Sequence, residues 1–302
     1  MVFDVSGISI APWVPLAWGI LVGLVFSAVG AGGGVLASLG LISVLGLTDA
    51  NLVKPMAQML TLASPLVAVP SYYKQRRLVL GLAVLLGAGG VVGALIGSNL
   101  SVRYLGELRI FKPVFGLFIL LIALQLGWRL VGQKRSSDSR AERAAAAFER
   151  RVRERGVPET LGVEQLRSSA VRFEFRFGNE RFRYSPWIPF LVALGIAVIS
   201  SALGVGGGFL LVPFMSIALG LPMTIVAGTA ALAIFISSVA SISNYVFLGV
   251  RLDIPLLALL LAGTAAGSYL GPRLSKYMHE TWLRAMLAAV LFLISIRYLG
   301  PW

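Results

Sequence analysis

Two copies of one glycine-rich stretch decide the fold: Ser27-Ala28-Val29-Gly30-Ala31-Gly32-Gly33-Gly34 and Ser201-Ala202-Leu203-Gly204-Val205-Gly206-Gly207-Gly208, 174 residues apart. The same offset, without a gap, pairs Arg77-Leu78 with Arg251-Leu252, and 23 of the 79 positions from 27 to 105 are identical. Apolar composition alone would scatter matches among Leu and Ala, and would not align glycines and an arginine. The sequence therefore predicts an internal duplication.

The composition excludes an ordinary soluble domain. Hydrophobic residues make up 57% of the 302 residues, charged residues only 13%, and the mean hydropathy is +0.86. Because soluble domains carry about 25% charged residues, most of this surface must face lipid. The absence of cysteine excludes disulfides, iron–sulfur clusters and thiolate zinc sites. The lone His279 cannot form a metal site by itself, so we expect no metal and no cofactor.

The net charge of +13 is concentrated in the middle of the chain. Between Arg129 and Arg183 there are 14 basic and 8 acidic residues, which leaves 26 − 14 = 12 and 13 − 8 = 5 for the rest. This distribution is typical of a membrane protein and not of a nucleic-acid binder, so we expect a lipid partner and no nucleic acid. The basic segment would also favour an anionic leaflet.

Apolar stretches long enough to cross a bilayer need about 20 residues. They lie at 13–47, 52–73, 78–98, 110–131, 187–221, 224–248, 254–274 and 282–300. The first and fifth are too long for one crossing and are interrupted by glycines. The Lys/Arg bias favours two half-crossings for each, with the basic segment in the cytoplasm. We therefore expect an all-α polytopic membrane protein of two homologous, inverted repeats with five helical segments each; single crossings and parallel repeats are the alternative.

The expected domains are a first transmembrane repeat at 1–131, a basic soluble insert at 132–186 and a second repeat at 187–302. Within the insert, Ser139 and Glu142 have capping-box spacing and predict a short helix. Alternating aromatic and charged residues around Gly178-Asn179 predict a β-hairpin. Because an isolated hairpin is marginally stable, its aromatic face should dock on that helix, on the membrane or on a second subunit of a homo-oligomer.

The glycines of the two breaks are the first candidates for a binding site. Glycine lets the chain reverse and lets backbone amides approach a ligand, and a half-helix that starts after the break favours an anion. The candidates are Gly30, Gly32, Gly33 and Gly34 in the first copy and Gly204, Gly206, Gly207 and Gly208 in the second. The alternative is that these glycines only allow close helix packing.

Polar side chains in the apolar segments are the second candidates, because such residues are costly in lipid and are often functional. For substrate binding they are Lys54, Gln58, Arg77, Thr229, Asn244, Tyr245 and Arg251. Snorkelling, interfacial anchoring and helix–helix hydrogen bonding are the alternatives. Asp253 either balances the charge of Arg251 or acts as a protonatable coupling group.

The sequence lacks the sets of residues that common catalytic sites require. One histidine cannot support a Ser/His/Asp set, and outside the insert there are five acidic residues. Gly34 is followed by Val35-Leu36 and not by the lysine of a phosphate-binding loop, which argues against ATP-driven transport. We therefore expect a protein that is not an enzyme.

The two copies of Gly-x-Gly-Gly-Gly are accompanied in the second half by Gly204-Val205-Gly206-Gly207-Gly208-Phe209-Leu210-Leu211-Val212-Pro213, Ala227-Gly228-Thr229, Asn244-Tyr245 and Gly249-Val250-Arg251-Leu252-Asp253. With these motifs the chain resembles the sulfite exporter TauE/SafE family of membrane proteins over about 13–131 and 187–300, and the second half matches most closely. The first half departs from it at Lys54-Pro55, and the insert is longer than usual in the family. The resemblance implies a secondary transporter, usually an exporter, of sulfite, sulfoacetate or related organosulfonates in the bacterial cytoplasmic membrane. An anion channel or a membrane scaffold is the alternative.

Overall fold

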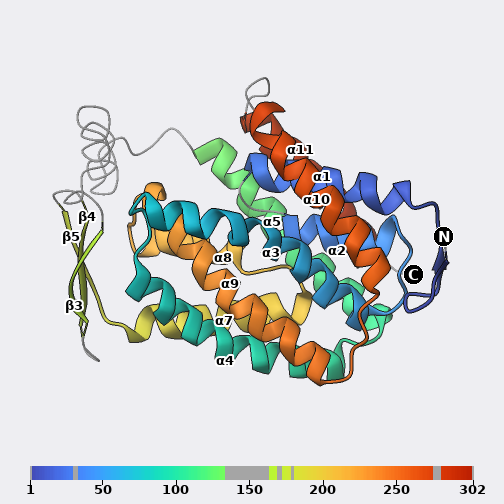
Figure 1. Cartoon of the computed structure of the whole chain (residues 1–302), viewed down its shortest axis with the longest axis horizontal. Helices are drawn as coiled ribbons and strands as arrows, with labels where there is room; N and C mark the ends of the chain where they lie inside the picture. Colours follow the sequence, from blue (N-terminus) through green and yellow to red (C-terminus); the bar gives the residue numbers. More distant parts are fainter. Residues whose placement is uncertain are drawn as a thin grey trace.

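The computed structural model describes residues 2–29, 33–132, 163–168, 172–177, 180–274 and 280–300. In this part of the chain there are ten α-helices, one short π-helix and two small sheets (Figure 1). The helices form an elongated bundle, with the larger sheet beyond one end and both chain termini at the other.

The first half contains five helices where the sequence predicts five segments. They are α1 (Trp13–Val29), α2 (Gly33–Ser43), α3 (Ala50–Lys74), α4 (Leu80–Tyr104) and α5 (Leu108–Gly132). The first long apolar stretch thus contains two helices, as expected, and residues 30–32 between them lie outside the described residues. Asp49 begins α3 by accepting a hydrogen bond from the Asn51 amide at 2.8 Å, because its side chain satisfies a free donor of the first turn.

The second half follows the same order of elements. They are α7 (Trp187–Leu203), α8 (Gly208–Pro213), the π-helix η1 (Phe214–Ala218), α9 (Met223–Phe247), α10 (Ile254–Leu274) and α11 (Glu280–Leu299). Gly204 ends α7 with φ +73°, a left-handed conformation that favours glycine.

Both long apolar stretches fold back inside the bundle. A Cβ on Gly40 of α2 would collide with the indole of Trp18, so α2 returns along α1. In the second half, Tyr184 precedes α7 and its hydroxyl donates to the carbonyl oxygen of Leu219, which follows η1, at 2.6 Å. We call this end, where Tyr184 and Leu219 lie, the insert end, and the opposite end, where both termini lie, the terminal end.

Each half contributes a helix to the packing of the other. Helix α1 packs on α10, and α4 packs on α7 (Figure 1). A Cβ on Gly263 would collide with the carbonyl oxygen of Leu16, and one on Gly89 with that of Phe190. These two contacts are related by the 174-residue offset, and both need glycine because the helix backbones touch.

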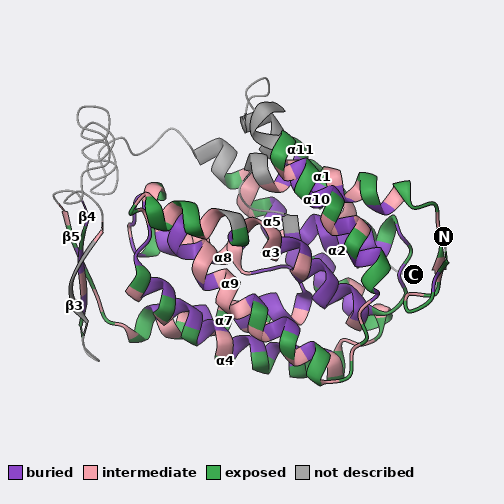
Figure 2. Ribbon diagram, viewed as in Figure 1, coloured by how far each residue is buried: buried purple, intermediate pink, exposed green. Residues whose placement is uncertain are grey.

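Among the described residues, four helices are long and apolar enough to cross a membrane: Ala50–Lys74, Leu80–Tyr104, Leu108–Trp128 and Met223–Phe247. Shorter apolar helices surround them. Exposed residues follow the outer faces of the bundle, while buried residues fill the space between helices (Figure 2). Large apolar side chains such as Leu117, Leu121 and Leu293 are among the exposed residues, as expected for a surface in lipid.

The insert contains the predicted hairpin and one further strand. Strands β4 (Phe173–Phe177) and β5 (Glu180–Tyr184) pair antiparallel, with Phe175 opposite Phe182, and β3 (Glu164–Ser168) adds to the free edge of β4. The aromatic face is buried in one apolar cluster with residues of the insert end. The predicted helix near residue 142 lies outside the described residues. A second, two-stranded sheet, β1 (Val2–Phe3) and β2 (Ile8–Ser9), precedes α1.

Candidate functional site

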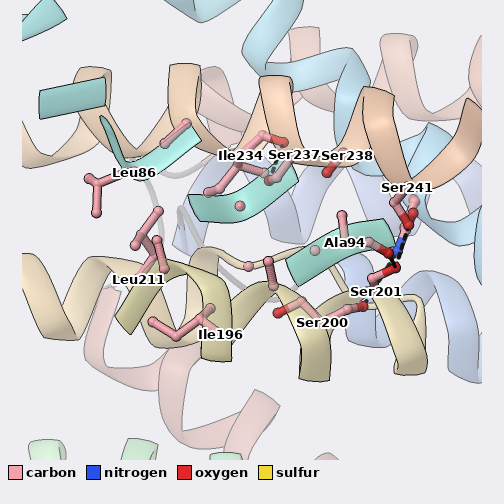
Figure 3. A pocket seen from close by; sticks show the side chains of 17 residues that line it. Leu86, Ala94, Ile196, Ser200, Ser201, Leu211, Ile234, Ser237, Ser238 and Ser241 are labelled. Atoms are coloured by element: carbon pink, nitrogen blue, oxygen red, sulfur yellow. Dashed lines mark hydrogen bonds between the residues drawn. The ribbon is translucent and has the colours of Figure 1, made fainter. Parts of the chain in front are cut away.

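A small cavity lies at mid-depth in the bundle, between α3, α4, α7, α8 and α9 and beside the break that follows Gly204 (Figure 3). Its volume is about 20 Å³, enough for about one molecule the size of water. Its polar lining consists of Gln58, Ser200, Ser201, Ser237, Ser238 and Ser241. No charged side chain lines it in the described part of the chain.

The cavity has an apolar side and a polar side. Leu86, Ile196 and Leu211 gather on one side, and Ser200, Ser201 and Ser241 lie on the other (Figure 3). Such a division suits a small ligand with a polar head and a short carbon chain, because most small-molecule sites combine apolar walls with a few convergent polar groups.

The second glycine break forms the wall of this cavity. Gly206, with φ +69°, and Gly207 both line it. The backbone hydrogen bonds at this point are donated by the amides of Gly204, Val205 and Leu210. In the part of the chain that the structure describes, the N–H groups of Gly206, Gly207 and Gly208 donate no hydrogen bond. Free amides at the start of a helical segment are suited to bind an anion.

Gly34 of the first copy has a different environment. A Cβ on Gly34 would collide with the carbonyl oxygen of Val205 and would lie 2.9 Å from Thr61 Cγ2. The start of α2 therefore touches the second break, and Gly34 is needed for close packing there. Gly33 begins α2, whereas Gly30 and Gly32 lie outside the described residues.

Gln58 and Ser200 bring incompletely satisfied polar groups to the cavity. The Gln58 side chain is 2% exposed, and its Nε2 donates to the carbonyl oxygen of Ser200 over a long 3.4 Å. Gln58 Oε1 and Ser200 Oγ, both buried, have no hydrogen-bond partner in the described structure. Because buried polar atoms are rarely left unpaired, these two mark a place where a polar ligand could bind.

Lys54 lies outside the cavity. Its Nζ donates to the carbonyl oxygen of Leu105 at 2.7 Å and to Asn51 Oδ1 at 3.1 Å, and lies 5.1 Å from the centre of the Phe111 ring. Leu105 is the C-cap residue of α4, so the ammonium group stands at the negative end of that helix, where a cation is stabilising.

Thr229 and Arg77 also lie outside the cavity, near the insert end. Thr229 Oγ1 accepts a hydrogen bond from the amide of Val79, the N-cap residue of α4, at 3.0 Å. The carbonyl oxygen of Arg77 would lie 2.9 Å from a Cβ on Gly228. Thr229 thus holds the start of α4 against α9.

Asn244 and Tyr245 lie one turn from the cavity, on its terminal side. Asn244 Nδ2 donates to Ser98 Oγ at 2.6 Å, and the Tyr245 hydroxyl donates to the carbonyl oxygen of Ser201 at 2.9 Å. These bonds connect α9 to α4 and α7.

Arg251 lines a separate hollow of about 630 Å³ at the terminal end, together with Asp4 and Asp49. Its side chain is exposed. Asp253 is 1% exposed and accepts hydrogen bonds from the amide and hydroxyl of Ser6 and from the amide of Leu256. Its carboxylate therefore caps the start of α10 and fixes the N-terminal segment.

Ser200, Ser201 and Ser241 line the cavity but are not among the site residues that the sequence predicts. Two signals were present: Ser201 aligns with Ser27 just before the break, and Ser237 and Ser241 are one helical turn apart. Neither signal alone separates a cavity from an ordinary helix–helix contact.

The fold and the site define a multi-pass membrane protein with a polar cavity at mid-depth beside a broken helix, an arrangement typical of transporters. The model of the family described as "Sulfite exporter TauE/SafE" matches residues 15–298, and the chain belongs to this family of membrane transporters. No curated protein and no solved structure matches the chain.

Proposed function

We propose that this protein is a secondary transporter that exports a small sulfur-containing anion, such as sulfite, sulfoacetate or a related organosulfonate, across the bacterial cytoplasmic membrane. The observation that supports this most is the cavity beside the second glycine break, where no charged side chain lines the described structure and where free amides and the unpaired Ser200 hydroxyl can donate hydrogen bonds. Membership of the sulfite exporter family supports the same class of solute.

The binding mode follows from the donors at the cavity. Sulfite and sulfonate oxygens accept hydrogen bonds, and the hydroxyl of Ser200, the carboxamide of Gln58 and the amide of Gly207 can donate them. The apolar side, with Leu86 and Leu211, would contact the carbon chain of a sulfonate. A cavity of about 20 Å³ must widen to admit either anion, which requires the surrounding helices to move.

The two halves would supply this movement as inverted repeats. Helix α1 begins at the terminal end and α7 at the insert end, and the contacts of Gly89 and Gly263 are related by the 174-residue offset. In transporters built this way, one repeat rocks against the other around a site at the membrane midplane. Export of an anion would be favoured by the negative-inside membrane potential, about 2.3 kcal/mol per charge per 100 mV.

Transport by purified protein in proteoliposomes tests the proposal. We expect saturable uptake of labelled sulfoacetate or sulfite that is accelerated by unlabelled substrate inside the vesicles. An anion channel would instead give flux that rises linearly with concentration and lacks counterflow, and a scaffold would give none. The tight packing of Gly34 against Val205 is the observation that favours these two alternatives.

A further inference from the structure

A layer of polar side chains, three of them buried and one half-buried, separates the central cavity from the hollow at the terminal end. We call Ser98, Ser101, Asn244 and Tyr245 the polar layer. Ser98, Ser101 and Tyr245 are each 0% exposed, and none of the four lines the cavity or the hollow. They therefore occupy the space between the two.

Helix α4 passes through cavity, layer and hollow in order. Ala94 lines the cavity, Ser98 and Ser101 belong to the layer, and Val102 lines the hollow. Val102 follows Ala94 by eight residues, which is about 12 Å along the helix at 1.5 Å per residue.

Helix α9 repeats this order, and α3 runs from the cavity to the hollow without contributing a residue to the polar layer. Ser241 on α9 lines the cavity and Leu248, the C-cap residue of α9, lines the hollow, with Asn244 and Tyr245 between them. On α3, Gln58 lines the cavity and Asn51 the hollow, seven residues or about 10 Å away.

Hydrogen bonds close the layer in this conformation. Tyr245 donates to the carbonyl oxygen of Ser201, and Asn244 donates to Ser98. The Ser201 and Ser241 hydroxyls, 2.6 Å apart, close the cavity side. Three helices, α4, α7 and α9, are thus joined by side-chain bonds that a passing anion could replace, whereas a layer of leucines would offer it no donor.

We propose that the polar layer is the gate through which the anion passes between the central cavity and the terminal-end hollow. This inference rests on the proposed transport function. Polar groups buried at membrane depth are costly, and their usual role in transporters is to line the path of the solute. Breaking the Tyr245–Ser201 and Asn244–Ser98 bonds would open the path, and the exposed Arg251 stands at its outer mouth.

The natural lack of cysteine makes the path accessible to thiol labelling. The probe is 2-sulfonatoethyl methanethiosulfonate, applied to the terminal side of proteoliposomes that contain Ser98→Cys. We expect modification at a rate that excess sulfoacetate lowers at least about fivefold, because both anions compete for one path. The matched control is Leu95→Cys on the exposed face of the same helix, whose slow modification should not respond to sulfoacetate.

A second variant tests the gate itself. Tyr245→Phe removes the hydrogen bond to Ser201 and keeps the ring. In the double variant Ser98→Cys/Tyr245→Phe, the thiol should therefore be modified faster than in Ser98→Cys alone. The proposal is overturned if Val102→Cys in the hollow is modified but Ser98→Cys is not, in a protein that still transports sulfoacetate. It is also overturned if Tyr245→Phe leaves the rate unchanged. Loss of counterflow in the parent protein would instead contradict the proposed function.

Discussion

Replacing Gly207 by alanine separates a binding role from a packing role. Gly207 has φ −75°, which any residue adopts, and a Cβ there would lie 3.6 Å from Ile196 Cγ2 and 3.8 Å from Ser200 Oγ. These are ordinary contact distances, so the methyl group fits the folded protein. It would, however, stand at the wall of a cavity of only about 20 Å³.

The expected effects on stability and on binding have opposite signs. Stability should stay unchanged or rise by about 0.4–1 kcal/mol, because alanine lowers the entropy of the unfolded chain. Binding should weaken, because an extra methyl group in a filled site costs about 1–3 kcal/mol. That cost corresponds to about 5- to 150-fold in affinity.

Thermal denaturation in detergent measures the first effect and counterflow in proteoliposomes the second. Gly208→Ala is the matched control, since its Cβ would contact only Ile234 Cδ1, at 3.5 Å, and Gly208 does not line the cavity. Gly207→Val should abolish transport without loss of expression. Normal counterflow in both Gly207 variants would refute the idea that this break holds the ligand.

Three further substitutions test other parts of the structure. Lys54→Met removes the bond to the Leu105 carbonyl and should lower stability by about 1–3 kcal/mol, measured by thermal denaturation, with an unchanged apparent substrate constant. Arg251→Gln should raise that constant in uptake assays and leave the melting temperature unchanged; an unaltered constant would leave Arg251 as an interfacial anchor. Tyr184→Phe loses the bond to Leu219 and should speed proteolysis within the insert, whereas equal cleavage rates would show that this bond does not hold the sheet.

The sequence predicted most helices because lipid imposes their length. The segment expected at 52–73 is the helix Ala50–Lys74, and the one expected at 254–274 is Ile254–Leu274. Strand β3 was not expected, since Glu164–Ser168 has no alternating pattern and forms a strand by pairing with the edge of β4.

The site was harder to predict because packing decides which glycine has space beside it. Gly34 and Gly208 align in the sequence, yet a Cβ on Gly34 would collide with Val205 and one on Gly208 would not collide. The cavity also depends on differences between the halves: Gln58 aligns with Leu232, and Ser200 with Phe26. Aligning the two halves identifies the residues that they share, so it does not point to cavity residues that occur in one half alone.

The lack of a charged side chain in the described lining of the cavity bears on how the anion would be released and on which way the membrane potential would drive it. A fixed cation beside the cavity would attract an anion strongly in a medium of low dielectric constant, and release would then be slow. Hydroxyls and amides bind more weakly, and flux requires a site that the solute can both enter and leave. If the cavity carries no charge of its own, the only charge that crosses the membrane potential during transport is that of the solute. For a monovalent anion, 100 mV then supports a concentration ratio of about 50 outward, with no carboxylate needed for a coupling ion.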